Sequence, residues 1–322
     1  MWNSALISLY MTAKLLPLPP DLSTPARGER SNVRGMVWML GSAVCFTAMA
    51  GLLKVLAQRG FSEAEMIFFR AAAGFAVLAP VAVVGGWRRW AVRRPWQVLW
   101  RCLYSTVGFY ASFYAFVHLP LAQAQAITFS RTLFVVVLAA LLLHEAVGWR
   151  RWAAVGVGFI GVLVMTRPSG ASFDPATLAA LAASFFFALS IVTVKDLTRD
   201  HSTLTLVLWT NAFTTLVGLP FALWDWTTPG ALDFLLLLGL GLAGVGAQSC
   251  YVRALSHGEA SALGLVDYVR LPLAVLMGFV LFAERPDGLT LIGAAVVIGS
   301  TVYIAWRESR KQIARVPVEP AT

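Results

Sequence analysis

The chain alternates between long apolar segments and short stretches that carry most of its charge. An α-helix of about 20 apolar residues is long enough to cross the roughly 30 Å hydrocarbon core of a bilayer. Ten segments meet or approach this length, and the pattern predicts an all-α integral membrane protein with ten transmembrane helices. The segments span residues 34–53, 64–84, 97–117, 120–142, 151–166, 176–195, 203–223, 232–254, 260–282 and 289–306.

Short signals mark where some of these helices begin. Ser62-Glu-Ala-Glu65 has the spacing of a capping box, in which the Ser and Glu side chains each bond the other's backbone N–H. It predicts the start of the second helix. Pro120 and Pro175 suit first-turn positions, where the missing N–H of proline has no helical partner to lose.

Composition agrees with a membrane protein. Of the 322 residues 58% are hydrophobic and 13% are charged, whereas soluble domains carry about 25% charged residues. The net charge of +9 does not indicate nucleic-acid binding, because the basic residues lie in short loops rather than in one stripe. Cys45, Cys102 and Cys250 show no spacing typical of a disulfide or metal site. No cofactor, metal or nucleic-acid partner is expected.

Lys and Arg residues are concentrated on one side of the predicted bundle. Of the 25 in the chain, 17 fall on the side of the two termini, four in the opposite loops and four within helices. Basic loops stay cytoplasmic, so both termini are expected inside a bacterial inner membrane. Residues 1–32 are expected to form a disordered cytoplasmic tail, and residues 307–322 a second cytoplasmic tail. The uncharged start at Met1–Tyr10 does not match a cleaved signal peptide.

The sequence repeats itself at an offset of about 140 residues. Ala115–Glu145 and Ala254–Glu284 align without a gap. Residues 33–166 and 174–306 are therefore expected to be two five-helix units. Because five is odd, the second unit is inverted, and such repeats enclose a substrate site near the midplane. The scarce residues that match are His118 with His257, Arg131 with Arg270, Glu145 with Glu284, and Lys54 with Lys195.

Several short runs make the chain similar to a known family of carriers. They are Ala-Phe-x-His-Leu-Pro-Leu-Ala-x-Ala from Ala115, Leu143-His-Glu145, Phe282-Ala-Glu284, Phe68-Phe-Arg70 and Asp267-Tyr-Val-Arg270. In these runs the chain resembles the EamA branch of the drug/metabolite transporter superfamily, over about residues 33–306. The resemblance implies a helical basket around a central cavity and transport of small organic metabolites, commonly export.

Arg131 and Arg270 lie near the middle of predicted helices and are the leading candidates for substrate binding. Each is about 16–21 Å from either helix end, at 1.5 Å per residue. A central Arg costs about 2.5–3.5 kcal/mol in a membrane. Both arginines therefore need water, a counter-charge or an anionic substrate group.

The two arginines differ in their local partners. Asp267 lies three residues before Arg270, close enough on the helix to form an ion pair, whereas the residue three before Arg131 is the neutral Thr128. Arg131 is therefore expected to meet a substrate carboxylate, and Asp267 an amine or a coupling proton. Pro272 removes a helical hydrogen bond to the preceding turn, which predicts either a packing kink or a carbonyl facing a cavity.

Further charged and aromatic residues lie within the predicted helices. Arg70, roughly 12 Å into its helix, is expected to line the outer vestibule or to pair with Glu65. Arg101 is expected to extend to the cytoplasmic surface, and Glu145 and Glu284 to pair with nearby arginines such as Arg150 or Arg285. Candidates for stacking on a planar substrate include Tyr104, Tyr110, Trp209 and Tyr268.

Two Gly-x-Gly-x-x-Gly runs begin at Gly156 and Gly239. A dinucleotide-binding loop needs this motif between a strand and a helix, whereas both runs lie inside predicted helices. They are expected to be small-residue faces where helices pack closely.

The sequence therefore predicts a transporter rather than an enzyme, because the helices carry no nucleophile with a base and no metal motif. The expected substrate is a small anionic or zwitterionic metabolite, such as an amino acid or derivative, moved by alternating access with export favoured. One alternative is a planar vitamin or nucleoside-like metabolite, in either direction. A scaffold or sensor that transports nothing is an alternative of another class. The protein is expected to be a monomer or homodimer in the lipid bilayer.

Overall fold

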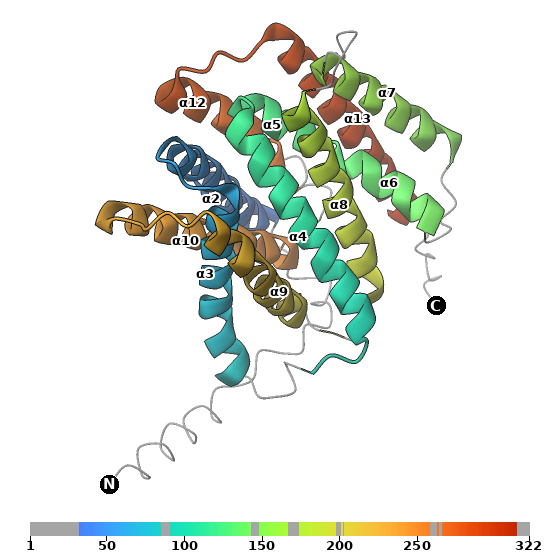
Figure 1. Cartoon of the computed structure of the whole chain (residues 1–322). Helices are drawn as coiled ribbons and strands as arrows, with labels where there is room; N and C mark the ends of the chain where they lie inside the picture. Colours follow the sequence, from blue (N-terminus) through green and yellow to red (C-terminus); the bar gives the residue numbers. More distant parts are fainter. Residues whose placement is uncertain are drawn as a thin grey trace.

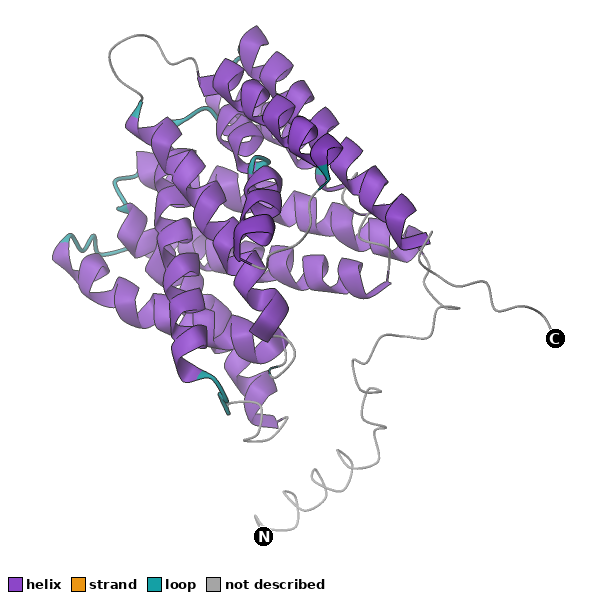
Figure 2. Cartoon of the chain, turned by 90° about the vertical axis from the view of Figure 1, so that its right-hand side faces the viewer, coloured by secondary structure: helices purple, strands orange, loops and turns teal. Residues whose placement is uncertain are grey.

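The computed structural model describes residues 32–84, 91–142, 148–166, 174–197, 201, 203–257, 263 and 266–313. Within these residues the regular structure is entirely helical (Figure 2). Glu145, most of the first predicted tail and the end of the second lie outside the described residues. The helices, labelled in Figure 1, are α2 (Asn32–Gln58), α3 (Glu63–Val84), α4 (Pro95–His118), α5 (Leu121–Thr128), α6 (Arg131–Leu142), α7 (Trp149–Thr166), α8 (Pro175–Leu197), α9 (Thr203–Trp224), α10 (Ala231–His257), α12 (Arg270–Phe282) and α13 (Gly288–Ile313).

The described helices are those of a multi-pass membrane protein. Six stretches are long and apolar enough to cross a bilayer, and α12 is a shorter apolar helix. α5 and α6 together make one of the six stretches, although a turn divides them. α13 continues to Ile313, so the predicted tail from residue 307 begins as helix. The six stretches are Val33–Gln58, Leu121–Leu142, Pro175–Thr193, Leu204–Trp224, Ala231–Ala254 and Gly288–Trp306.

The predicted capping box is confirmed at the start of α3. The Glu65 backbone N–H donates to Ser62 Oγ at 3.3 Å, and the Ser62 N–H donates to Glu65 Oε2 at 2.9 Å. Pro175 is the first residue of α8, as predicted. Pro120 instead takes the N-cap position, one residue before α5, with an extended ψ of 138°.

The helices pack in a few extensive pairs. α2 packs along α10 and α4 along α8, while α3 packs against α9 and α7 against α13. Figure 1 shows α4 and α8 running side by side through the molecule. Further contacts are made by α3 with α10, α4 with α9, α6 with α8, α12 with α2, and α5 with α12. The main apolar core lies where these pairs meet, around residues such as Leu53, Met66, Ile127 and Leu133.

Small residues allow the closest of these approaches. A Cβ on Gly158 in α7 would lie 2.6 Å from Leu133 and Ser300, and one on Gly241 in α10 would lie 2.4 Å from the Cβ of Ala73. Both glycines belong to Gly-x-Gly-x-x-Gly runs inside helices, so the runs serve helix packing as predicted.

Polar contacts tie helix ends together on each side of the bundle. At one end, Lys54 pairs with Glu284, whose second oxygen accepts the Leu121 N–H at 2.8 Å. Arg59 pairs with Asp233, Glu63 lies 3.8 Å from His118, and Glu65 accepts the Thr227 N–H at 2.6 Å. At the other end, the Arg93 N–H donates to Nε2 of His201 at 2.9 Å.

Two sequence-based interpretations are wrong in detail. Glu284 was expected to pair with an arginine such as Arg285, but it pairs with Lys54, because its helix end folds back toward α2 and α5. Arg101 was expected to extend to the cytoplasmic surface, but it donates to the Leu206 carbonyl at 3.0 Å and to Thr210 Oγ1 at 2.6 Å. Both bonds come from Nη1, so α9 holds this end of the guanidinium within the bundle.

Candidate functional site

Two predicted transmembrane segments are interrupted near their middle, and each interruption ends at a candidate arginine. α6 begins at Arg131 after a turn at residues 129–130, and α12 begins at Arg270 after a turn at residues 268–269. The two turns carry the same backbone hydrogen bonds at an offset of 139 residues. Ser130 N–H donates to Ile127 and Thr132 N–H to Phe129, while Val269 N–H donates to Val266 and Leu271 N–H to Tyr268.

These hydrogen bonds span three residues rather than four, so both interruptions are 3₁₀ turns. Phe129 (φ −66°, ψ −20°) and Val269 (φ −59°, ψ −20°) have matching dihedral angles. A 3₁₀ turn within a longer helix often marks a hinge or a strained sequence. The turns therefore put both arginines at points where the helices change geometry.

Pro272 explains only one of the two turns. It cannot donate to the Tyr268 carbonyl, which instead accepts the Leu271 N–H at 3.0 Å and is not left free. The equivalent position in the first half is Leu133, whose N–H donates to Ser130 at 2.9 Å. Proline is thus not required for this geometry.

Arg270 is held on several sides. It is 8% exposed, and its Nε lies 2.8 Å from Asp267 Oδ1, so the predicted ion pair is present. Its Nη2 donates to Ser42 Oγ at 3.1 Å, and its guanidinium lies 4.7 Å from the ring centre of Phe46. Ser42 in turn donates to the Ala247 carbonyl at 2.9 Å. Arg270 therefore connects α12 to α2 and, through Ser42, to α10.

Tyr268 lies beside this arginine and has a fixed hydroxyl. The hydroxyl bonds Thr301 Oγ1, and Thr301 donates its own proton to the Ile298 carbonyl at 2.9 Å, so Tyr268 is the donor. Its ring packs edge-on against Phe129, with ring centres 4.9 Å apart. Phe129 and Tyr268 are equivalent positions at the offset of 139 residues.

Arg131 has a different environment from Arg270. Its side chain is partly exposed, and within the described part of the chain it forms no hydrogen bond or ion pair. It lies close enough to Tyr268 and Arg270 to influence both electrostatically. Thr128, its nearest candidate partner, donates its hydroxyl to the Ala124 carbonyl at 2.8 Å instead. Arg131 is therefore a charge without a counter-ion among the described residues.

Arg70 is 7% exposed and stacks on Phe109, with its guanidinium carbon 3.8 Å from the ring centre. The expected pairing with Glu65 is not formed. Both oxygens of Glu65 are taken by the Ser62 cap and by the Thr227 N–H.

Two of the remaining aromatic candidates contact other aromatic side chains. Tyr110 packs against Phe221 of α9, at a ring distance of 6.2 Å. Tyr104 stacks on Trp100, which is 42% exposed on α4. Trp209 is 38% exposed on the face of α9 that also presents Leu216. The structure thus brings together Arg131, Asp267, Tyr268 and Arg270, but not Tyr104 or Trp209.

Ser42, Phe46 and Thr301 contact the central cluster although the sequence did not single them out as site residues. Phe46 matches Phe187 in the repeat, and this match was the available signal. Ser42 and Thr301 carry none, because single hydroxyls in apolar helices commonly bond their own backbone.

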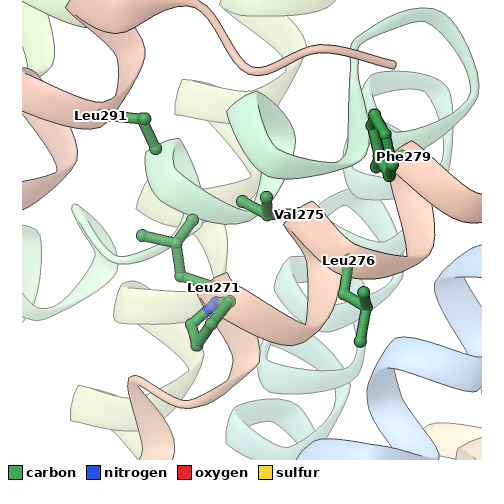
Figure 3. Close-up of a pocket in the computed structure, with 6 residues that line it drawn as sticks. Leu271, Val275, Leu276, Phe279 and Leu291 are labelled. Carbon is green, nitrogen blue, oxygen red and sulfur yellow. The ribbon is translucent and has the colours of Figure 1, made fainter. Parts of the chain in front are cut away.

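A shallow groove on the outer surface is a separate feature. Its lining includes Leu271, Val275, Leu276 and Phe279 of α12 and Leu291 of α13 (Figure 3). Pro272 completes the lining. All of these side chains are apolar, and Leu276 and Phe279 are more than half exposed. The groove suits contact with lipid chains rather than with a polar metabolite.

A multi-pass helical bundle with charged side chains between its helices is typical of membrane transporters. Residues 33–167 and 174–306 each match the EamA-like transporter family. The chain therefore belongs to this family, whose members are transporters of small molecules rather than enzymes.

Relatives with assigned activities cover most of the chain. An S-adenosylmethionine uptake transporter of Rickettsia prowazekii is 30% identical, over 87% of this chain and 95% of the relative. A riboflavin transporter of Vibrio cholerae is also 30% identical, over the same shares. A pseudopaline exporter of Pseudomonas aeruginosa is 26% identical, over 84% of this chain and 95% of the relative. A crystal structure that is 17% identical shares the fold, with a TM-score of 0.62 over 87% of this chain and 100% of that chain.

Proposed function

We propose that the protein is an inner-membrane carrier for a small zwitterionic or anionic amino-acid derivative, which it moves by alternating access, most readily outward. Arg131 binds the substrate carboxylate, and Asp267 takes its amine or a coupling proton. The observation that carries this proposal is the state of Arg131, which is partly exposed and has no counter-ion among the described residues. A cation at this depth in a membrane is costly without a counter-charge, so a substrate carboxylate is a fitting partner.

The proposed architecture is ten spans in two inverted five-helix repeats, residues 33–166 and 174–306, around a central cavity. The helix pairing supports it, because exchanging the two halves converts the α2–α10 pair into α8–α4 and the α3–α10 pair into α9–α4. The contact between Phe129 and Tyr268 supports it too. Two equivalent residues can touch each other only close to the axis that relates the repeats.

Contacts between helix ends support the proposed division of the loops between the two membrane faces. With both tails cytoplasmic, Lys54, Arg59 and Glu65 lie in or next to external loops. Their respective partners, Glu284, Asp233 and Thr227, also lie in or next to external loops. Arg93 and His201, which also contact each other, both lie on the cytoplasmic side. Each of these ties joins ends that the proposed topology puts on one face of the membrane.

Transport by purified protein in proteoliposomes tests the proposal. S-adenosylmethionine is the first labelled probe, because it carries an amino-acid carboxylate and amine and gives one relative its name. A panel of unlabelled amino-acid derivatives then competes with it. Saturable transport that Arg131→Ala abolishes supports the proposal. If competitors with and without a carboxylate inhibit transport equally, the proposal is wrong.

A planar vitamin-like substrate is the second candidate. The riboflavin transporter among the relatives and the Phe46, Phe129 and Tyr268 rings beside the arginines favour it. Riboflavin has no carboxylate, so its transport should survive Arg131→Ala and weaken when Phe129→Ala removes a stacking ring. The pattern of these two variants distinguishes the two substrates.

A further inference from the structure

Arg70 is a buried cation whose hydrogen-bonding capacity is largely unused. The residue is 7% exposed, and its Nε and Nη1 have no acceptor among the described residues. Every N–H of a guanidinium needs an oxygen partner once water is removed. Burying a guanidinium without acceptors costs free energy. A bound anion that supplies oxygen acceptors would remove this cost.

The side chains around Arg70 provide no counter-charge. Its guanidinium lies over Phe109 of α4, and a Cβ on Gly244 of α10 would lie 3.3 Å from its Nε. The same Cβ would lie 3.4 Å from Met49 of α2. The groups that these contacts identify around Arg70 are two apolar side chains and the backbone of α10. The Phe109 ring stabilises the charge but accepts none of its N–H groups in their plane.

The acidic residues of this part of the bundle are engaged elsewhere. Glu65, one turn and a half earlier on α3, caps its own helix and binds Thr227. Asp233 pairs with Arg59, and Asp267 pairs with Arg270. None of these carboxylates is available to neutralise Arg70.

Arg70 lies close to the central cluster. Arg270 contacts α2 at Ser42 and Phe46, whereas Arg70 shares its surroundings with Met49. Met49 follows Phe46 by three residues, which is about 4.5 Å along the helix axis. Along α2, the neighbour of Arg70 therefore lies about one helical turn from the neighbour of Arg270, on the side of Lys54. A step of one helical turn is about 5.4 Å, which is within the length of a small organic molecule.

We propose that Arg70 is a second anion-binding position of the substrate site, which selects substrates with two anionic oxygen groups. One group binds Arg131, as in the proposed function on which this inference rests, and the other binds the free N–H groups of Arg70. The planar fork of the guanidinium matches a carboxylate with two parallel hydrogen bonds. The preferred substrate is then an acidic amino-acid derivative, whose two carboxylates neutralise Arg70 and Arg131.

Thermal unfolding of the purified protein tests this without knowing the substrate. In low-salt buffer Arg70→Met should unfold at a temperature higher than wild type by on the order of a few degrees, because it replaces an uncompensated buried charge by an apolar chain. A merely structural arginine would give a lower unfolding temperature on replacement. Arg101→Met is the matched control. It should lower the unfolding temperature, because Arg101 is bonded to Leu206 and Thr210.

Binding is measured with malonate, a small dicarboxylate, against acetate at equal ionic strength. Malonate should raise the unfolding temperature of wild type and of Arg101→Met more than acetate does, and Arg70→Met should lose this difference. A lower unfolding temperature for Arg70→Met, or a malonate response equal to that of wild type, overturns the inference. If one of these two results is found and Arg131→Ala still abolishes transport, the proposed function stands and only the role given to Arg70 is wrong. If Arg70→Met loses the malonate response while Arg131→Ala transports normally, Arg70 remains an anion site and the role given to Arg131 fails.

Discussion

Arg270 and Asp267 neutralise each other between the helices, so removing one partner leaves the other buried. Arg270→Ala should cost about 3–5 kcal/mol of stability, because the Asp267 carboxylate loses its ion-pair partner. The expected result is a reduced amount of folded protein in the membrane. Adding Asp267→Asn should restore part of it, since the amide carries no charge. Quantitative blotting of membrane fractions measures both variants, and an undiminished level for Arg270→Ala would contradict the structural role of the pair.

Arg131 has no such partner, so its replacement should affect activity rather than abundance. Arg131→Ala should accumulate like wild type and lose transport in proteoliposomes. Arg131→Lys should recover little transport, because an ammonium group cannot reproduce two parallel hydrogen bonds to a carboxylate. Equal transport by wild type and Arg131→Ala would remove this residue from the substrate site.

Individual contacts were predictable from sequence only where they are local. The Asp267–Arg270 pair follows from a spacing of three residues on one helix, and it is present. The contacts of Arg270 with Ser42 and Phe46 depend on how α2 packs beside α12, and single serines and phenylalanines in apolar helices give no signal of that. For the same reason Trp209 looked like a substrate-facing residue until the exposed face of α9 was known.

At the scale of helices, the Gly-x-Gly-x-x-Gly run in α7 provides a packing test with its own control. Gly158→Leu would force side-chain carbon against Leu133 and Ser300, whereas Gly156 has no neighbouring atom within 4 Å. Gly158→Leu should therefore cost about 1–3 kcal/mol or more by overpacking, and Gly156→Leu should be tolerated. Thermal unfolding of both purified variants makes the comparison. Equal stability of the two variants would show that α7 does not depend on this close approach.

The interrupted helices mark the limit of sequence reasoning about elements. Hydropathy predicted residues 120–142 and 260–282 as single spans, because apolar composition does not register a change from four-residue to three-residue hydrogen bonds. Pro272 indicated one interruption, although the carbonyl it frees is bonded by Leu271. The interruption before Arg131 has no proline and no glycine, so the local sequence carries no signal for it.

At the scale of the molecule, the Lys54–Glu284 pair joins the two matched halves at one end of the bundle. Glu284 reaches Lys54 because Ala283 adopts a left-handed conformation (φ 52°) that turns the chain back after α12. The carboxylate also caps α5 through the Leu121 N–H, so three segments converge on one acidic group. Sequence comparison had matched Lys54 with Lys195 and Glu284 with Glu145, but it could not show that the lysine of one half meets the glutamate of the other.

The proposed inverted arrangement of the halves leads to a direct prediction for topology. Reporter domains fused near Gly170 and Thr228 should be active outside the membrane, and those fused near Val92 and Ser202 should be active in the cytoplasm. The physical basis is the distribution of Lys and Arg, 17 on the side of the termini against four in the opposite loops, because basic loops are retained on the cytoplasmic side. Paired alkaline phosphatase and fluorescent-protein fusions measure each site, because the first is active outside and the second folds in the cytoplasm. A cytoplasmic signal at Thr228 would mean an even number of spans between it and Val92, and the two units could not then be inverted copies.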